Sequence, residues 1–198
     1  AAVCNSFVRQ RQHELIRFDE DTFYLPHSTS LRSSNLGYQS DAQTKHMQVC
    51  YNSLPSYINS LAEAICDHYP PYEEIGTKVN DGYRQINTSI LQSEAEFYSS
   101  IRAKRVPSPG ENFLVRLQQD GVEYIEVRLL DVNPYNPLGI GESEIDFLDT
   151  FLLYCLLTRS PVHDDPIYDE VRHNNITTVH QGRSPHLNLQ DHGNSRPL

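Results

Sequence analysis

The chain has 198 residues, of which 38% are hydrophobic and 21% are charged, and its formal net charge is −10 at pH 7. This composition is typical of a soluble globular protein with one domain and a real core, or with two small domains. The acidic balance argues against a general nucleic-acid binder, which normally carries a basic patch. The longest strongly apolar run, "FLLYCLL" at 151–157, is too short to span a bilayer.

The four cysteines, Cys4, Cys50, Cys66 and Cys155, are scattered and form no C-x-x-C pair. This pattern favours a reduced intracellular protein whose thiols are mostly buried as small hydrophobic groups. A cytoplasmic location is therefore expected.

The first forty residues read as irregular apart from a short extended piece at 22–26, "TFYLP". Residues 28–38, "STSLRSSNLGY", have the composition of a loop, which either is a solvated surface loop or presents polar groups to a ligand. Residues 53–68 predict a helix, with Ser53 as its cap, Pro55 in its first turn and an apolar stripe at helical spacing.

Residues 83–98 are ambiguous between strand and short helix, and residues 99–113 follow as "SSIRAKRVPSPGENF". The densest basic cluster of the chain lies here and consists of Arg102, Lys104 and Arg105. Such a cluster is either a solvated basic rim or a phosphate contact made by charge-assisted hydrogen bonds.

Residues 121–134, "GVEYIEVRLLDVNP", alternate as a β-strand does. Ile125, Val127 and Leu129 fall on one face, and Glu126 and Arg128 fall together on the other. Either these two charges form exposed cross-strand ion pairs, or the face is a reaction floor. In the second case Glu126 is suited to Mg²⁺ and Arg128 to a phosphate oxygen.

A helix is expected from about Ser143, where Ser143 and Asp146 resemble a capping box. Its second half is apolar nearly all round, which predicts deep burial. Residues 159–198 read as a polar tail for which poor order is one expectation. The histidines and acids of this segment have spacings that match no known metal site.

Several segments, in this order, resemble glutamate–cysteine ligase of the enteric-bacterial type: "FYLPHSTSLRSSNLGY", "QINTSILQSEAEFYSSIRAKRV", "GVEYIEVRLLDVNPYNPLGI", "IDFLDTFLLYCLL" and "VHQGRSP". The resemblance covers nearly the whole chain. It implies an α+β fold like the glutamine-synthetase catalytic domain, mainly an antiparallel sheet with packing helices. His27 departs from the tyrosine of the family pattern.

The family's reaction joins the γ-carboxylate of L-glutamate to the amine of L-cysteine through a γ-glutamyl phosphate formed with ATP, as the first step of glutathione biosynthesis. The resemblance therefore implies ATP as a substrate, Mg²⁺ (or Mn²⁺) as the metal, a monomeric full-length enzyme, and no nucleic-acid or membrane partner.

The resemblance also assigns roles by position. Glu126 corresponds to a magnesium-binding glutamate and Arg128 to the arginine that stabilises the transferring phosphoryl group. Arg32, Tyr38 and Tyr98 correspond to residues of the cysteine pocket. The basic cluster Arg102, Lys104 and Arg105 is expected near the ATP phosphates.

The family's remaining metal-binding acids lie in a segment that would precede this one, so the chain is expected to be a partial catalytic domain that is inactive alone. Two alternatives stay open. One is a related carboxylate–amine ligase with another amine substrate, and the other is a truncated, non-catalytic relative.

Overall fold

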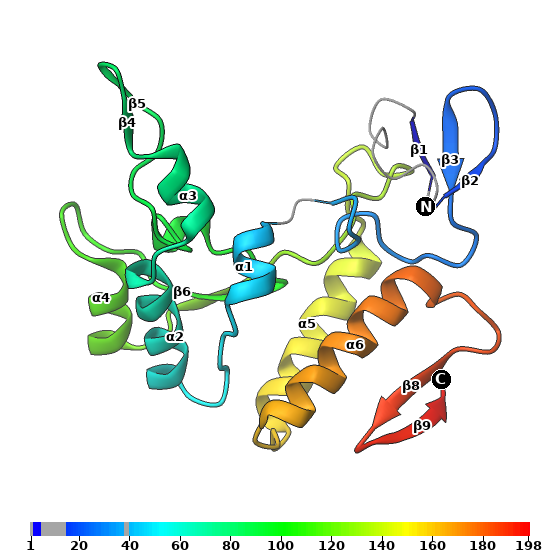
Figure 1. The fold of residues 1–198 in the computed structure, drawn as a ribbon. Helices are drawn as coiled ribbons and strands as arrows, with labels where there is room; N and C mark the ends of the chain where they lie inside the picture. Colours follow the sequence, from blue (N-terminus) through cyan, green and yellow to red (C-terminus); the bar gives the residue numbers. More distant parts are fainter. Residues whose placement is uncertain (1, 5–14, 38–39) are drawn as a thin grey trace. The chain divides into compact units, whose positions relative to one another are not determined.

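The computed structural model describes residues 2–4, 15–37 and 40–198, and these divide into two compact units (Figure 1). Residues 37–129 form one unit, here called the central unit. Residues 1–36 and 130–198 form the other, here called the terminal unit. None of the helices is long and apolar enough to cross a membrane in the part of the chain that is described.

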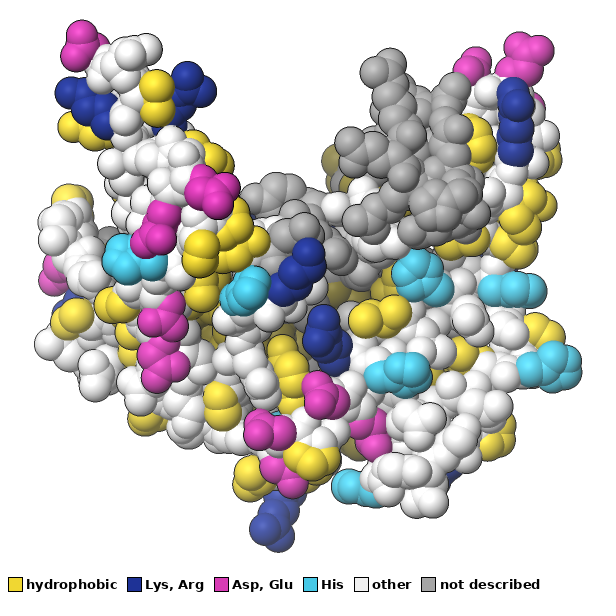
Figure 2. Space-filling view, viewed as in Figure 1, with side chains coloured by type: hydrophobic (Ala, Val, Ile, Leu, Met, Phe, Trp, Pro, Cys, Tyr) yellow, Lys and Arg dark blue, Asp and Glu magenta, His cyan; other side chains and the backbone are white. Residues whose placement is uncertain are grey.

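The central unit contains four α-helices, one 3₁₀ helix and two antiparallel strand pairs among its described residues. The helices are α1 (Asp41–His46), α2 (Leu54–Cys66), α3 (Pro70–Ile75), η3 (Glu94–Glu96) and α4 (Phe113–Asp120). The strands are β4 (Lys78–Val79), β5 (Gly82–Tyr83), β6 (Ile101–Lys104) and β7 (Tyr124–Val127). The two strand pairs are the β4–β5 hairpin and the β6–β7 hairpin, and the connection of the second contains α4. The β4–β5 hairpin projects from this unit and carries basic and apolar side chains (Figure 2).

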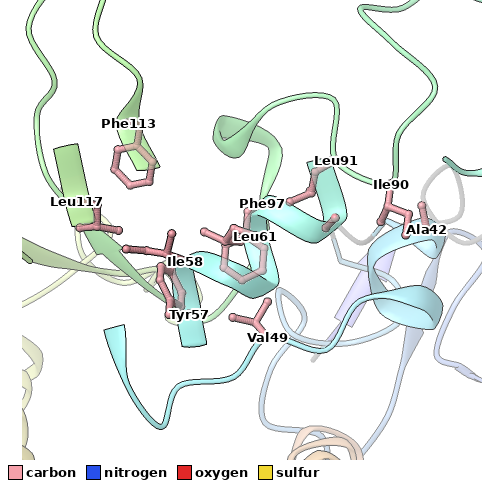
Figure 3. Packing of buried hydrophobic residues seen from close by; sticks show 11 residues of the cluster. Ala42, Val49, Tyr57, Ile58, Leu61, Ile90, Leu91, Phe97, Phe113 and Leu117 are labelled. Carbon is pink, nitrogen blue, oxygen red and sulfur yellow. The ribbon is translucent and has the colours of Figure 1, made fainter. Parts of the chain in front are cut away.

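The core of the central unit lies around α2 (Figure 3). Ser53 caps the helix by accepting the backbone N–H of Ser56, and a proline occupies its first turn, as the sequence predicts. Tyr57, Ile58 and Leu61 then point inward at helical spacing. They pack with buried residues of the surrounding elements: Ala42, Val49, Ala64, Ile90, Leu91, Phe97, Phe113 and Leu117.

The terminal unit combines a small sheet, two long helices and a hairpin. Strands β1 (Ala2–Cys4), β3 (Thr22–Tyr24) and β2 (Ile16–Arg17) pair antiparallel in that order. The helices are α5 (Glu142–Leu157) and α6 (Asp165–Gln181). Strands β8 (Asn188–Asp191) and β9 (Asn194–Pro197) form the hairpin. It is held to α6 because the Asn174 side chain bonds both backbone groups of Gln190.

The predicted α+β composition with antiparallel pairing is confirmed, and so are the helix at 53–68 and the extended piece at 22–26. The paired part of the predicted strand at 121–134 is shorter and covers only β7. Strand β6 and helix α4 were not predicted. For β6 the reason is that the alternation of "IRAK" spans only four residues and the loop signals around it were stronger.

Three further expectations changed in the terminal unit. Helix α5 begins at Glu142, before the predicted Ser143, and Glu144 makes the capping contact by accepting the Gly141 N–H at 3.1 Å. Deep burial of this helix was wrong for the described structure, where Leu156 and Leu157 are 80% and 78% exposed. The segment 159–198, expected as a polar tail, contains α6 and the β8–β9 hairpin.

Candidate active-site face of the β6–β7 hairpin

The β6–β7 hairpin places the charged residues of two distant segments on one face. Its register sets Arg102 opposite Glu126 and Lys104 opposite Tyr124. Because side chains alternate between the faces of a strand, these residues share one side of the hairpin. Arg128 follows β7 on the same parity, and its backbone N–H donates to the Ser100 carbonyl at 2.8 Å, which continues the pairing. We call this side the charged face.

The central pair of the charged face is Arg102 and Glu126. Arg102 Nη1 lies 3.7 Å from Glu126 Oε2, and the arginine side chain is 7% exposed against 42% for the glutamate. The other terminal nitrogen, Nη2, donates to the Glu94 carbonyl at 3.2 Å. The Arg102 guanidinium is therefore buried and held in place, while the Glu126 carboxylate is partly exposed and accessible to a further ligand.

Arg128 and Tyr98 meet at the edge of the same face. The guanidinium carbon of Arg128 lies 5.3 Å from the centre of the Tyr98 ring, within the range of a cation–π contact. The backbone at Tyr98 is held by Gln43 of α1, whose Oε1 accepts the Tyr98 N–H at 2.9 Å and whose Nε2 donates to the Glu96 carbonyl at 3.0 Å.

Lys104 completes the positive charge of the face. Its Nζ lies 4.8 Å from the centre of the Phe113 ring. Partial burial lowers the pKa of Lys104 below its ordinary value, and the positive charges of Arg102 and Arg128 lower it further, while Glu126 and Glu94 oppose the shift. Three cations thus act on one another at this face, which favours an anionic ligand.

Arg105, the third member of the predicted basic cluster, is directed elsewhere. Its Nε donates to the Gly121 carbonyl at 2.6 Å and its Nη2 to the Asp120 carbonyl at 2.8 Å. These carbonyls lie at the C-terminal end of α4, where backbone acceptors need partners. The side chain thus ties the strand exit to this helix end.

The other predicted cysteine-pocket residues lie outside the central unit or outside the described structure. Arg32 belongs to the loop at 27–36 of the terminal unit, and Tyr38 lies outside the described residues. The loop contains well-formed turns: Ser34 donates through its hydroxyl and its N–H to the Leu31 carbonyl, at 2.7 and 3.2 Å. Ser28 and Ser34 are buried, so the segment is more than a solvated surface loop.

The metal site expected at Glu126 is only partly provided here. Among the described residues no group of three or more His, Cys, Asp or Glu side chains could hold a metal ion. The half-exposed Glu126 carboxylate fits as one oxygen ligand of Mg²⁺, an ion that usually keeps several waters and shares phosphate oxygens. The described residues therefore fit one corner of a magnesium site.

The opposite face of the hairpin is apolar and borders an open pocket of about 190 Å³. Ile101, Ala103 and Ile125 line the pocket from the strands, and Leu54 and Tyr57 line it from α2. Burial raises the pKa of the Tyr57 hydroxyl. The hairpin thus separates an apolar side from the charged face.

Two residues that shape the charged face were absent from the sequence predictions. Gln43 holds the backbone of Tyr98 from 55 positions away, and Glu94 supplies a carbonyl to Arg102. No motif surrounds Gln43, so only the folded chain shows its role. The capping-like Ser-x-x-Glu pattern of Ser93 and Glu96 marks the turn that contains Glu94, and this signal could have been used.

Comparison with known proteins gives a consistent result. The glutamate–cysteine ligase family model matches residues 1–179. A glutamate–cysteine ligase of Pseudomonas putida is 48% identical over 197 residues, which are 100% of this chain and 37% of that protein. One from Pseudomonas aeruginosa is 50% identical over 187 residues, or 94% of this chain and 35% of that protein.

The crystal structure of glutamate–cysteine ligase from Francisella tularensis in complex with AMP shares the fold, with a TM-score of 0.91 and 32% sequence identity. The match covers 99% of this chain and 39% of that one. The chain thus spans somewhat more than a third of the length of these relatives. It belongs to the glutamate–cysteine ligase family.

Proposed function

We propose that this chain supplies the charged face to an ATP-dependent ligase that joins L-glutamate to L-cysteine. Its relatives carry the name of that enzyme, and the solved structure that shares its fold is a complex with AMP. In the proposed reaction the γ-carboxylate of glutamate takes the γ-phosphoryl group of ATP and releases ADP. The cysteine amine then attacks the acyl carbon, loses a proton and displaces phosphate.

The observation that carries this proposal is the contact of Arg128 with Tyr98 on the face that bears Glu126. The amine of the second substrate must reach the acyl phosphate carbon at about 3–3.5 Å for attack. The wall of the amine pocket and the phosphoryl-binding arginine must therefore be neighbours. The contact of Tyr98 with Arg128 supports assigning these two roles to them.

Arg128 contributes by binding the phosphoryl oxygens in a planar fork. Charge on the transferring group is spread over its equatorial oxygens in the transition state, so a fixed guanidinium is worth more there than in water. The Tyr98 ring restricts the guanidinium to one side. Lys104 and Arg102 add positive potential to the face and attract the polyanionic nucleotide.

Glu126 would hold Mg²⁺ together with ligands beyond the described residues, and the ion would neutralise phosphate charge and orient the phosphate oxygens. Arg102, whose Nη2 donates to the Glu94 carbonyl, lies 3.7 Å from Oε2 of Glu126. The Glu126 side chain is 42% exposed, which leaves room for an additional ligand. By the resemblance to the family, Arg32 is assigned to the carboxylate of cysteine, and Tyr38 and Tyr98 are each assigned to cysteine binding.

The test is substrate dependence in the complete protein, measured as γ-glutamylcysteine and ADP formed from L-glutamate, L-cysteine and ATP. We expect the two products in equal amounts and no dipeptide without ATP or Mg²⁺. Glu126→Gln should raise the Mg²⁺ requirement and cut turnover, while Glu74→Gln, exposed on α3, should change neither. Selective use of another amine instead of cysteine would identify a related carboxylate–amine ligase.

A further inference from the structure

We infer that Asp131 is a positioning residue for the cysteine-binding loop. This inference rests on the proposed function, because it concerns the loop that carries Arg32. Asp131 Oδ1 accepts the backbone N–H of Leu31 at 3.1 Å and that of Arg32 at 2.7 Å. A carboxylate oxygen shared by two successive N–H groups makes charge-assisted bonds and fixes the direction of the backbone between them.

The start of the same loop is fixed at the C-terminal end of α6. The Thr29 N–H donates to the Val179 carbonyl at 2.9 Å and its hydroxyl to the Thr178 carbonyl at 2.8 Å. The Arg183 N–H donates to the His27 carbonyl at 3.0 Å. The loop is thus hydrogen-bonded to the C-terminal end of α6 before Arg32, and to Asp131 at Arg32 itself.

Gly182 allows this close approach of the loop to α6. A Cβ atom at this position would lie 2.5 Å from Thr29 Cγ2 and would also clash with the Thr178 carbonyl oxygen, so the loop or the helix end would have to shift. This gives the "VHQGRSP" segment a physical role. It supplies the Val179 carbonyl as an acceptor, the Arg183 N–H as a donor, and the space at Gly182 that the beginning of the Arg32 loop occupies.

Asp131 lies just before a loop that closes on the start of α5. The Asn133 N–H donates to the Gly139 carbonyl at 2.8 Å, and the Asn133 side chain donates to Glu144 Oε1 at 2.9 Å. The other oxygen of Glu144 accepts the Gly141 N–H. Asp131 therefore lies just before a loop closed by several hydrogen bonds.

Consequently, removal of the Asp131 carboxylate should release the backbone at Arg32 without altering the charged face. In the proposed function, phosphoryl transfer depends on Glu126 and Arg128 of the central unit. Binding of the cysteine carboxylate depends instead on the position of the Arg32 backbone. The expected effect is on the apparent affinity for cysteine, with turnover at saturating cysteine maintained.

The experiment measures kcat and the three KM values in the complete protein for Asp131→Ala, Asp131→Asn, Arg32→Ala and Asp149→Ala. Asp131→Ala should raise the cysteine KM about tenfold or more, which is about 1.4 kcal/mol of lost binding, with kcat and the ATP and glutamate KM values within about twofold. Asparagine keeps an oxygen that accepts both N–H groups, so Asp131→Asn should restore the cysteine KM to within about threefold of the wild-type value. Asp149, an aspartate on α5 that is also exposed, is the matched control, and its substitution should change none of these values.

The outcomes separate the inference from the proposed function. If the wild-type protein makes no γ-glutamylcysteine, the proposed function fails. If the wild-type protein is active and Arg32→Ala raises the cysteine KM, but Asp131→Ala leaves it unchanged or lowers only kcat, the positioning role is overturned. It is also overturned if Asp131→Asn behaves like Asp131→Ala, because the hydrogen bonds would then not be the cause.

Discussion

The three residues of the basic cluster differ in what their side chains contact. Arg102 lies buried between Glu126 and the Glu94 carbonyl, and Lys104 lies over the Phe113 ring. Arg105 instead binds the Gly121 and Asp120 carbonyls. Arg102 and Lys104 are two residues apart on β6 and so share a face, whereas Arg105 follows the last residue of the strand. Strand parity separates the cluster into two members on the charged face and one at a helix end.

We therefore expect Arg105→Ala to affect stability and not nucleotide binding. The substitution leaves two carbonyls at the end of α4 without their charged donor, which costs about 1–2 kcal/mol. Thermal unfolding and the ATP KM should be measured together. A lower melting temperature with an unchanged ATP KM would support the structural role, and a tenfold rise in ATP KM without destabilisation would contradict it.

Arg128→Lys tests the phosphoryl contact in the complete protein. A lysine keeps the charge but loses the planar fork, so turnover should fall by roughly a hundredfold while the ATP KM changes by less than about threefold. Steady-state kinetics at saturating cysteine would show this split. Arg84→Lys, on an exposed arginine after β5, is the matched control. Equal turnover in both variants would contradict the phosphoryl contact and leave only the contact of Arg128 with the Tyr98 ring.

At the scale of elements, the segment that follows β7 is joined by hydrogen bonds to the start of α5. The strand ends at Val127, one further backbone hydrogen bond follows at Arg128, and the chain then folds into a closed loop that ends at the N-terminus of α5. Glu144 joins these parts by accepting from the Asn133 side chain and from the Gly141 N–H. The hydrogen bond from Asn133 is the largest of the contacts that lower the pKa of Glu144 below its ordinary value of 4.5.

This shift predicts a pH dependence with a definite sign. A lowered pKa means that the fold favours the ionised carboxylate, so its stabilising contribution is present above the ordinary value and is lost as pH falls through the lowered one. Glu144→Gln should therefore lower the melting temperature at neutral pH, and the difference from wild type should shrink toward zero as the pH falls below about 4. Glu142→Gln, on the same helical turn, is the control. A difference that persists at low pH would exclude ionisation as the cause.

At the scale of the whole molecule, the two units differ in how completely they bury their apolar residues. The central unit has a contiguous core in which Leu61 and Leu91 are 1% and 0% exposed. Among the described residues, the buried cluster of the terminal unit is smaller and centres on Phe23, with Leu15, Leu31 and Leu36 packed against it. Local stability should accordingly be higher in the central unit.

Leu61→Ala should destabilise the central unit by about 2–5 kcal/mol, because it removes packed methyl groups and leaves a cavity. Native-state hydrogen exchange would show the loss of protection in residues 40–129. Leu156→Ala on α5 removes the same atoms from a side chain that is 80% exposed, and it should change the stability of the described chain by less than about 0.5 kcal/mol. Equal effects of the two substitutions would contradict this contrast.

The sequence by itself determined features that depend on local order: the capped helix at 53–68, the parity that sets Glu126 beside Arg128, and the segments that resemble the ligase family. These follow from 3.6-residue and two-residue periodicities and from short motifs, which need no knowledge of distant residues. The resemblance also named Tyr98 and Arg32, yet it said nothing of how their backbones are held.

Only the tertiary structure decided which distant groups meet. The pairing of β6 with β7 brought Arg102 to Glu126, the side chain of Gln43 reached Tyr98, and Asp131 reached the backbone of Arg32. Such contacts join positions separated by 24 to 99 residues in the chain, so no local periodicity encodes them. They arise because buried or directional hydrogen-bonding groups must find partners once the chain has packed.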